Sequence, residues 1–291
     1  MDLFLQFLIN GLAIGAVYAI VAVGYSLIYG VLQCIAFSHA DTCMVSGYVA
    51  YAAMALLGLP LPVAVLMAIS AGALLGVIVE RVAYRPLRHA PRIMPLISAL
   101  GVSIILQNAA ALLFGPQSRN IDIGVSSLRG IAISGAVLPA AEAVILITAL
   151  ILGIGLYFFL KSTRIGLAIR AVACDAEAAE VLGIPSQAIV SITFAVSSAV
   201  AAVGGLLVAS AYDLFPTMGV LLGFKAFTAC VLGGIRSLYG SIVAAVCLGV
   251  VENLAAGYLS SEYKDAYAFA ILVGVLAVRP QGLFGASDRR I

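Results

Sequence analysis

Charged residues are scarce in this chain of 291 residues: only 10% are Asp, Glu, Lys or Arg, whereas 64% are hydrophobic. Soluble domains carry about 25% charged residues, and the mean hydropathy of +1.18 is also far above their range. An ordinary soluble protein is therefore excluded. Because a helical membrane span needs about 20 mostly apolar residues, roughly eight to ten spans with short loops fit in the chain. We expect one membrane domain covering residues 1–291, with the lipid bilayer as its surroundings.

Sequence signals for chemistry are also lacking. The five cysteines are scattered without a CxxC pair, and the two histidines, His39 and His89, lack the spacing of metal ligands. No H-E-x-x-H, G-x-S-x-G or G-x-x-x-x-G-K-[ST] motif is present. We therefore expect no catalytic residues, no metal site and no cofactor bound by this chain, and nothing points to a nucleic-acid partner. Because no phosphate loop is present, energy for any process that this chain carries out must come from elsewhere.

Charges and Pro/Gly clusters divide the chain into nine apolar segments: 3–33, 42–57, 63–83, 93–115, 137–160, 187–212, 216–235, 238–258 and 266–282. Segments of this kind predict an all-α, polytopic transmembrane bundle. The first segment is long for one helix, and a break within it would change the span count and the side of the N-terminus. Small residues four apart, such as Gly11 with Gly15 and Gly72 with Gly76, predict close helix packing.

Lysine and arginine separate alternate loops into two sets. Cytoplasmic loops retain an excess of these residues. One set holds eleven of them: Arg81, Arg85, Arg88, Arg92, Lys161, Arg164, Arg170, Arg236, Arg279, Arg289 and Arg290. The other set holds only Arg119, Arg129 and Lys264. The first set is predicted to be cytoplasmic, which places the C-terminus and the loop within residues 161–187 inside the cell.

That loop is the longest polar island of the chain. Helix formers run from Arg164 to Gly183, and Gly183 followed by Pro185 is a stop signal, so one or two short amphipathic helices are expected. A helix lying on the membrane surface is one interpretation. Docking into a cleft of a partner protein is the other, and it accounts for the small residues Ala178 and Ala179 in an exposed loop.

Residues 177–183, Glu-Ala-Ala-Glu-Val-Leu-Gly, resemble the EAA-x-x-x-G loop of bacterial ABC importer permeases. Three further segments, over nearly the whole chain, resemble the LivH-like permeases of branched-chain amino acid transporters: IAFSHAD at 35–41, ERVAYRPLR at 80–88 and RPQGLFG at 279–285. The segment 35–41 departs from the family's usual I-N-F-A-H-G-D at Ala36, Ser38 and Ala40. These departures leave the family assignment intact and concern the identity of the cargo.

The resemblance implies a bacterial inner-membrane importer subunit for branched-chain or related amino acids. Its partners would be a second related permease, two ATP-binding subunits and a periplasmic substrate-binding protein. ATP and magnesium would then be held by the ATP-binding subunits. It also implies that the loop couples to the ATPases through Arg164, Arg170, Asp175, Glu177, Ala178, Ala179 and Gly183. An ion-coupled secondary amino-acid carrier is the alternative, with only Asp41 and Glu252 to support it.

Polar residues inside apolar sequence are candidates for the translocation pathway: Asn10, Phe37, Ser38, His39, Asp41, Lys225 and Glu252. Residues 37–41 are expected to form a broken or re-entrant segment, because irregular backbone at membrane depth lines a cavity or is buried in protein. The alternative is a polar turn packed against the second permease. Lys225 and Glu252 either form a buried pair that orders helices or contact cargo. Asn10, Gln107 and Asn108 are expected to make hydrogen bonds between helices. Arg119, Asp122 and Arg129 are expected in an outer loop, which either receives a soluble binding protein or is an ordinary solvated loop.

Overall fold

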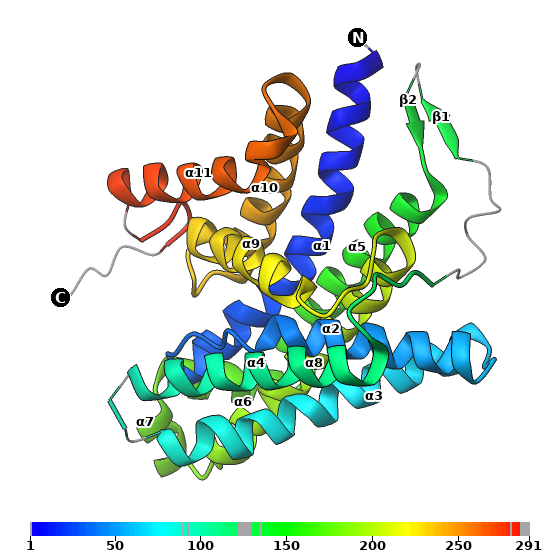
Figure 1. The fold of residues 1–291 in the computed structure, drawn as a ribbon. Helices are drawn as coiled ribbons and strands as arrows, with labels where there is room; N and C mark the ends of the chain where they lie inside the picture. Colours follow the sequence, from blue (N-terminus) through cyan, green and yellow to red (C-terminus); the bar gives the residue numbers. More distant parts are fainter. Residues whose placement is uncertain are drawn as a thin grey trace. The chain divides into compact units, whose positions relative to one another are not determined.

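A computed structural model describes residues 2–88, 90–91, 93–121, 130–133, 136–279 and 281–285. The predictions that involve His89, Arg92, Asp122, Arg129, Pro280, Arg289 and Arg290 lie outside the described residues. Helices dominate the fold (Figure 1), and each of the nine predicted apolar segments contains one. Six of the helices are long and apolar enough to cross a membrane, and α9 is a shorter apolar helix. The all-α, polytopic class is confirmed.

The described helices are α1 (Asp2–Leu32), α2 (His39–Tyr51), α3 (Leu61–Val79), α4 (Ile93–Phe114), α5 (Ala140–Ser162), α6 (Arg164–Cys174), α7 (Ala176–Val181), α8 (Ser186–Ala211), α9 (Met218–Gly233), α10 (Leu238–Tyr258) and α11 (Lys264–Val278). Two π-helical turns extend α2 and α3: η1 (Ala52–Leu56) and η2 (Glu80–Tyr84). Short 3-10 turns follow as η3 (Arg85–Leu87) and η4 (Ser261–Tyr263).

A small β-hairpin was not predicted. Strands β1 (Ile131–Ile133) and β2 (Ala136–Leu138) pair antiparallel, so the predicted apolar segment 137–160 begins as a strand and turns helical at Ala140. The Gln6 side chain donates to the carbonyl oxygen of Val137 at 3.0 Å and accepts from its N–H at 2.9 Å. Backbone groups of the strand thereby gain partners. The last segment also differs, because α11 begins at Lys264 and ends at Val278.

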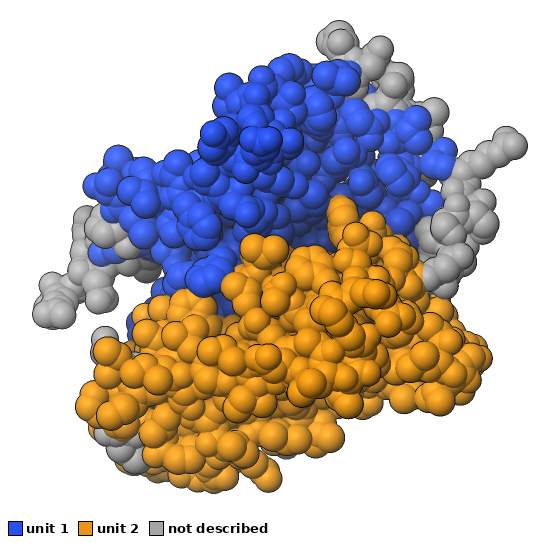
Figure 2. Space-filling model, in the orientation of Figure 1, with its two compact units in different colours: residues 1–26, 122–150, 224–291 blue, residues 27–121, 151–223 orange. Residues whose placement is uncertain are grey.

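The chain forms two compact units, shown in different colours in Figure 2. Unit 1 comprises residues 1–26, 122–150 and 224–291. In it α1 and α10 approach through glycines, since a Cβ at Gly11 would lie 2.7 Å from the Val250 Cα and one at Gly15 would lie 2.8 Å from the Val246 Cα. The packing role predicted for this glycine pair is confirmed.

Unit 2 comprises residues 27–121 and 151–223, and α2, α3 and α8 pack together in it. A Cβ on Gly72 would lie 2.8 Å from the Ala202 Cβ, and one on Gly76 would lie 2.7 Å from the Ser198 Cβ. At the crossing of α2 and α8, a Cβ on Gly205 would collide with the carbonyl oxygen of Cys43. These helices therefore meet at backbone distance, as close packing in lipid requires.

Two helices contribute little to the interior. In an apolar stretch of 18 residues taken from each helix, 17% of the residues of α4 and 11% of those of α5 are buried, compared with 67% of those of α8. Leu112 and Leu113 of α4 are 87% and 78% exposed. Apolar surface of this extent is compatible with lipid or with another membrane subunit, but not with water.

Candidate coupling and translocation sites

The predicted polar island folds as two short helices, α6 and α7, each with a capped start. The Thr163 hydroxyl accepts a hydrogen bond from the Gly166 N–H at 2.9 Å, and the Asp175 carboxylate accepts one from the Ala178 N–H at 3.0 Å. Caps of this kind satisfy N–H groups that a helix start leaves without partners. Asp175, which the resemblance places at the ATPase contact, therefore also has a structural role, because its side chain caps the start of α7.

Gly183 ends α7 as the sequence predicts. Its φ of +82° lies in the left-handed region, which glycine adopts without the cost that a Cβ imposes. The Gly183 N–H donates to Glu180 O at 2.9 Å, and the Ile184 N–H donates to Ala179 O at 3.0 Å, so the last carbonyls of the helix are satisfied. The two ends of this six-residue helix are thus fixed locally.

The outer surface of the island carries most of the residues predicted to contact ATPases: Arg164, Arg170, Asp175, Glu177, Ala178 and Gly183 are exposed. Ala179 is different. Its side chain is only 3% exposed and belongs to the apolar core of unit 2, together with Ile169, Val172 and Ile189. The expectation that both alanines face a partner is wrong for Ala179, because a six-residue helix must turn one face inward to stay attached, and a small residue allows that contact.

Apolar side chains at the end of α7 stand out into the surroundings. Val181 is 88% exposed and Leu182 is 79% exposed, beside the acidic residues Glu177 and Glu180. Large apolar side chains rimmed by charges are typical of sites that contact another protein or a membrane. A helix lying flat on lipid headgroups would instead present basic residues around its apolar face.

A break in the helical path separates α1 from α2 at residues 33–38. It overlaps the predicted segment 37–41 only at Phe37 and Ser38, because α2 already begins at His39. Gln33 has a φ of +52°, and residues 33–38 are not helical before α2 begins at His39. Ser38, His39 and Asp41 are all at most 3% exposed. The Ser38 and Tyr84 hydroxyls are 3.2 Å apart, within hydrogen-bonding distance. Phe37 is half-buried. Ala36 and Ser38 of this segment are buried, as is the start of α2. Burial in protein is one of the two settings that permit irregular backbone at membrane depth.

Asp41 lies in polar surroundings formed by α4 and α9. The Gln107 amide donates to its Oδ1 at 3.3 Å and to the Ser103 hydroxyl at 2.8 Å. Gly219 comes so close that a Cβ there would lie 2.5 Å from Asp41 Oδ1. Among the described residues, no Lys or Arg nitrogen forms an ion pair with this carboxyl group.

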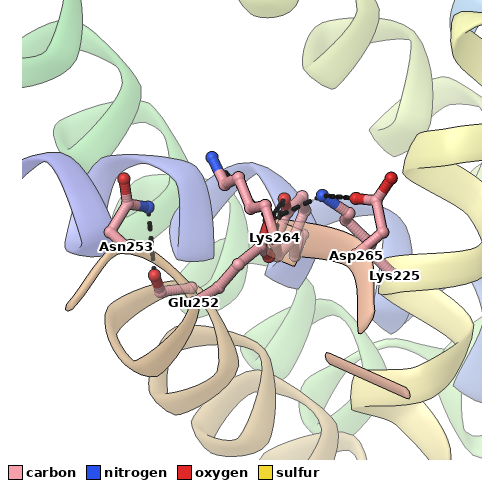
Figure 3. A network of polar contacts seen from close by, with 7 residues as sticks. Lys225, Glu252, Asn253, Lys264 and Asp265 are labelled. Carbon is pink, nitrogen blue, oxygen red and sulfur yellow. Dashed lines mark hydrogen bonds and ion pairs between the residues drawn. The ribbon is translucent and has the colours of Figure 1, made fainter. Parts of the chain in front are cut away.

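Lys225 and Glu252 form the buried pair that the sequence suggests, and the structure enlarges it (Figure 3). Lys225 Nζ lies 2.6 Å from Glu252 Oε1 and 2.7 Å from Asp265 Oδ1. Glu252 is fully buried, whereas the Asp265 side chain is 57% exposed. Lys264 Nζ approaches Glu252 Oε1 at 3.7 Å. We call these four residues the charge network.

Tyr18 of α1 completes the charge network's surroundings. Its hydroxyl donates to Glu252 Oε2 at 3.1 Å, and Lys225 Nζ lies 5.8 Å from the centre of its ring. Helices α1, α9, α10 and α11 of unit 1 are thus joined by one set of charge-assisted contacts. Ordering of helices is supported for this pair. Three members of this cluster were missed: Asp265, Lys264 and Tyr18. The first two lie near the end of a predicted segment, and Tyr18 lies in the middle of the segment 3–33, where a single tyrosine does not indicate a partner.

Amide side chains follow the prediction only in part. Gln107 bonds across helices to Asp41. Asn108 is exposed and donates to Ile104 O of its own helix at 2.8 Å, and Asn10 accepts from Gln6 of its own helix at 2.9 Å. The prediction of hydrogen bonds between helices is therefore wrong for both asparagines, because each finds a partner one turn away in its own helix. Ser103 was missed, although its spacing of four residues from Gln107 would place both on one helix face.

A chain of this kind, with many apolar helices, a buried broken segment and an exposed polar helix pair, is a multi-pass membrane transport subunit. The family model for the permease component of branched-chain amino acid transport systems matches residues 7–276. This chain belongs to that family. The family comprises transport permease subunits rather than enzymes.

Individual relatives cover almost the whole chain. The branched-chain amino acid permease BraD of Pseudomonas aeruginosa is 38% identical, over 98% of this chain and 97% of the relative. LivH of Salmonella typhimurium is 39% identical, over 98% and 96%, and LivH of Escherichia coli K12 is 38% identical over the same shares. The resemblance drawn from four short motifs is confirmed.

A solved structure supports the fold alone. PsaBC from Streptococcus pneumoniae, determined in complex with a Fab, matches with a TM-score of 0.53 over 95% of this chain and 93% of that one. The sequence identity is 16%, so the similarity concerns the arrangement of helices and not the cargo.

Proposed function

We propose that this chain is the inner-membrane permease of an importer for branched-chain or related amino acids, driven by two separate ATP-binding subunits. A second related permease and a periplasmic binding protein would complete the assembly. The observation that carries the proposal is α7: a helix capped at both ends, fixed to unit 2 through Ala179, with Val181 and Leu182 exposed. Such a helix is suited to a cleft in another protein.

Energy would enter through this helix. By the distribution of lysine and arginine, α6 and α7 lie on the cytoplasmic side, where ATP is available. Closure of the ATPases would push on α7, whose capped ends resist unwinding, and unit 2 would follow because Ala179 is packed in its core. The relatives' names connect permeases of this family to branched-chain amino acids, which supports that class of cargo here.

Substitution of Gly183 tests the coupling role. Gly183→Ala forces a Cβ into a left-handed conformation at a cost of about 1–2 kcal/mol, so α7 should fray, and recovery of ATPase subunits in a pull-down should fall roughly fivefold to thirtyfold. Gly155→Ala is the matched control, since nothing lies within 4 Å of a Cβ at Gly155. It should leave recovery unchanged. Equal recovery for both variants, with the permease folded, would count against docking through α7.

Asp41 is the residue we propose to recognise cargo in the pathway. Its buried carboxyl group has hydrogen-bond donors but no cationic partner within the described residues. A buried carboxylate without a counter-charge is costly. The ammonium group of an amino acid passing through would supply the missing charge, and the Gln107 and Ser103 side chains hold the carboxylate in place for it.

Asp41→Asn should leave the protein folded, because an amide keeps the size and the acceptor oxygen. Leucine uptake by the reconstituted transporter should fall roughly tenfold or more, since a hydrogen bond to a charged group contributes about 1.5–3 kcal/mol. ATP-independent uptake of leucine in vesicles containing this chain alone, driven by a proton gradient and abolished by the same change, would instead favour an ion-coupled carrier.

A further inference from the structure

The π-helical turn η2 lies between the two regions that an importer has to connect. It follows α3 directly and contains Glu80 and Tyr84, which are only 2% and 1% exposed, while Arg81 and Val82 between them are exposed. π-Turns inside helices are rare and are frequent at functional sites. Such a turn accommodates one residue more than an α-helical turn, so it is a place where a helix can change its register.

One side of η2 is tied to the helix pair on which the ATPases would act. The Ser186 hydroxyl, at the start of α8, donates to Ala176 O of α7 at 3.1 Å. One turn further along α8, the Ser191 hydroxyl donates to Glu80 Oε2 at 2.6 Å. Arg85, directly after η2, donates to the Gln187 side chain of α8. The first turns of α8 therefore connect α7 to η2 by side-chain hydrogen bonds.

The other side of η2 contacts the broken segment between α1 and α2. The Tyr84 hydroxyl hydrogen-bonds the Ser38 hydroxyl at 3.2 Å, and the Tyr84 ring packs on Phe194 of α8 with ring centres 5.3 Å apart. Tyr84 belongs to the same apolar core as Ala179 of α7 and Ala36 of the broken segment. All of these contacts lie within unit 2.

Because these elements are closely packed, a displacement of α8 would be transmitted through η2 to the broken segment. Tightly packed interiors transmit displacement, and rigid elements with two discrete arrangements carry coupling between sites. A buried tyrosine that contacts α8 with its ring and the broken segment with its hydroxyl cannot shift without moving one of them. Glu80 fixes the opposite end of the same turn to α8, and no Lys or Arg nitrogen pairs with it among the described residues.

We infer that Glu80 and Tyr84 are positioning residues that transmit movement of the α7–α8 corner to the broken segment at Ser38. Neither residue needs to touch cargo or ATPase. The inference depends on the proposed coupling role of α7, but it adds a route that the exposed surface of α7 does not reveal. It accounts for the burial of a carboxylate and a tyrosine at the predicted cytoplasmic end of α3. A helix end that served only to span the membrane would not need buried polar groups there.

Cys34 provides a reporter in the broken segment itself. It is half-buried, whereas Cys174 and Cys247 are exposed and Cys43 and Cys230 are buried. In a Cys174→Ser, Cys247→Ser background, the assembled transporter is reconstituted with its ATPases in liposomes. The rate of maleimide labelling at Cys34 is then compared between the nucleotide-free and the ATP–vanadate-trapped states. ATPase co-purification and basal ATP hydrolysis are recorded on the same samples.

Tyr84→Phe removes only the hydroxyl, and Ser191→Ala removes the donor to Glu80. Each should reduce the nucleotide-dependent change in Cys34 labelling by about threefold to tenfold, the factor expected for one net hydrogen bond, together with leucine uptake. ATPase co-purification and basal hydrolysis should stay unchanged. Glu80→Gln keeps an acceptor for Ser191 and should retain more of the response than Glu80→Leu. Tyr29→Phe is the matched control in unit 2, because the Tyr29 hydroxyl makes no hydrogen bond to the described residues.

Several results would overturn the inference. An unchanged labelling response in Tyr84→Phe and Ser191→Ala would do so, as would a Cys34 rate that does not respond to nucleotide in the unsubstituted background. Equal losses in Tyr29→Phe would show a general effect of hydroxyl removal. Failure of the ATPases to co-purify with the unsubstituted chain would be a different result, because it would refute the proposed function itself.

Discussion

Lys225→Met is expected to destabilise the folded protein by about 3–5 kcal/mol, the cost typical of breaking a buried ion pair by removing one partner. Methionine fills the space of the lysine stem. Among the described residues, the buried Glu252 carboxylate then keeps the Tyr18 hydroxyl and the more distant Lys264 as partners. Loss of the lysine costs Asp265 less free energy than it costs Glu252, since water reaches the Asp265 side chain. The thermal unfolding midpoint of the detergent-purified protein should fall by several degrees.

Three controls separate the ion pair from the loss of side-chain volume. Glu252→Gln added to Lys225→Met removes the uncompensated charge and should restore most of the stability, because the amide keeps its bond to Tyr18. Lys264→Met, which removes the cation 3.7 Å from Glu252, and Asp265→Asn, on the exposed side, should each cost at most about 1 kcal/mol. A double variant as unstable as Lys225→Met would contradict this account of the charge network.

Gly205→Val should prevent unit 2 from packing correctly and abolish recovery of monodisperse protein. A Cβ at Gly205 would collide with the Cys43 carbonyl oxygen, a backbone atom that cannot rotate away, and Gly47 of α2 is also close to this position. Overpacking a well-packed interior typically costs about 1–3 kcal/mol and occasionally more. Here α2 and α8 must separate, so the loss should lie at or above the upper end of that range.

Gly101→Ala serves as the control for that experiment. It also adds a Cβ within a long helix, but nothing lies within 4 Å of the new atom. Removal of a glycine from a helix interior stabilises it by up to about 1 kcal/mol, so this variant should be recovered at least as well as the unsubstituted protein. Size-exclusion profiles after detergent extraction compare the two directly, and similar profiles would show that the α2–α8 crossing tolerates a wider separation.

Much of the fold was accessible from composition, because membrane spans require long apolar runs that no soluble segment imitates. The end of α7 at Gly183 was predicted from local signals, whereas the break before α2 was expected at residues 37–41 and lies at 33–38. The hairpin before α5 was missed: residues 137–138 are as apolar as the helix that follows, and β2 depends on pairing with β1 and on Gln6, which is far away in sequence. The π-turns depend on packing that has no known local signature.

The candidate sites divide in the same way. A charge within an apolar segment requires a partner, so the pairing of Lys225 with Glu252 was accessible from sequence. Which face of α7 points inward was not, because Ala178 and Ala179 are chemically identical and only the core of unit 2 distinguishes them. The hydrogen bond between Tyr84 and Ser38 joins residues 46 positions apart, and neither residue type predicts the other.

The charge network contains two cations, Lys225 and Lys264, and two anions, Glu252 and Asp265. Bacterial membranes are electrically polarised, and each unbalanced elementary charge that crosses 100 mV changes in energy by about 2.3 kcal/mol. A group of four charges that sums to zero gives the voltage no net charge to act on. Displacement of all four charges together should therefore require little electrical work, whereas separating one cation from its anions along the field would require work against the voltage.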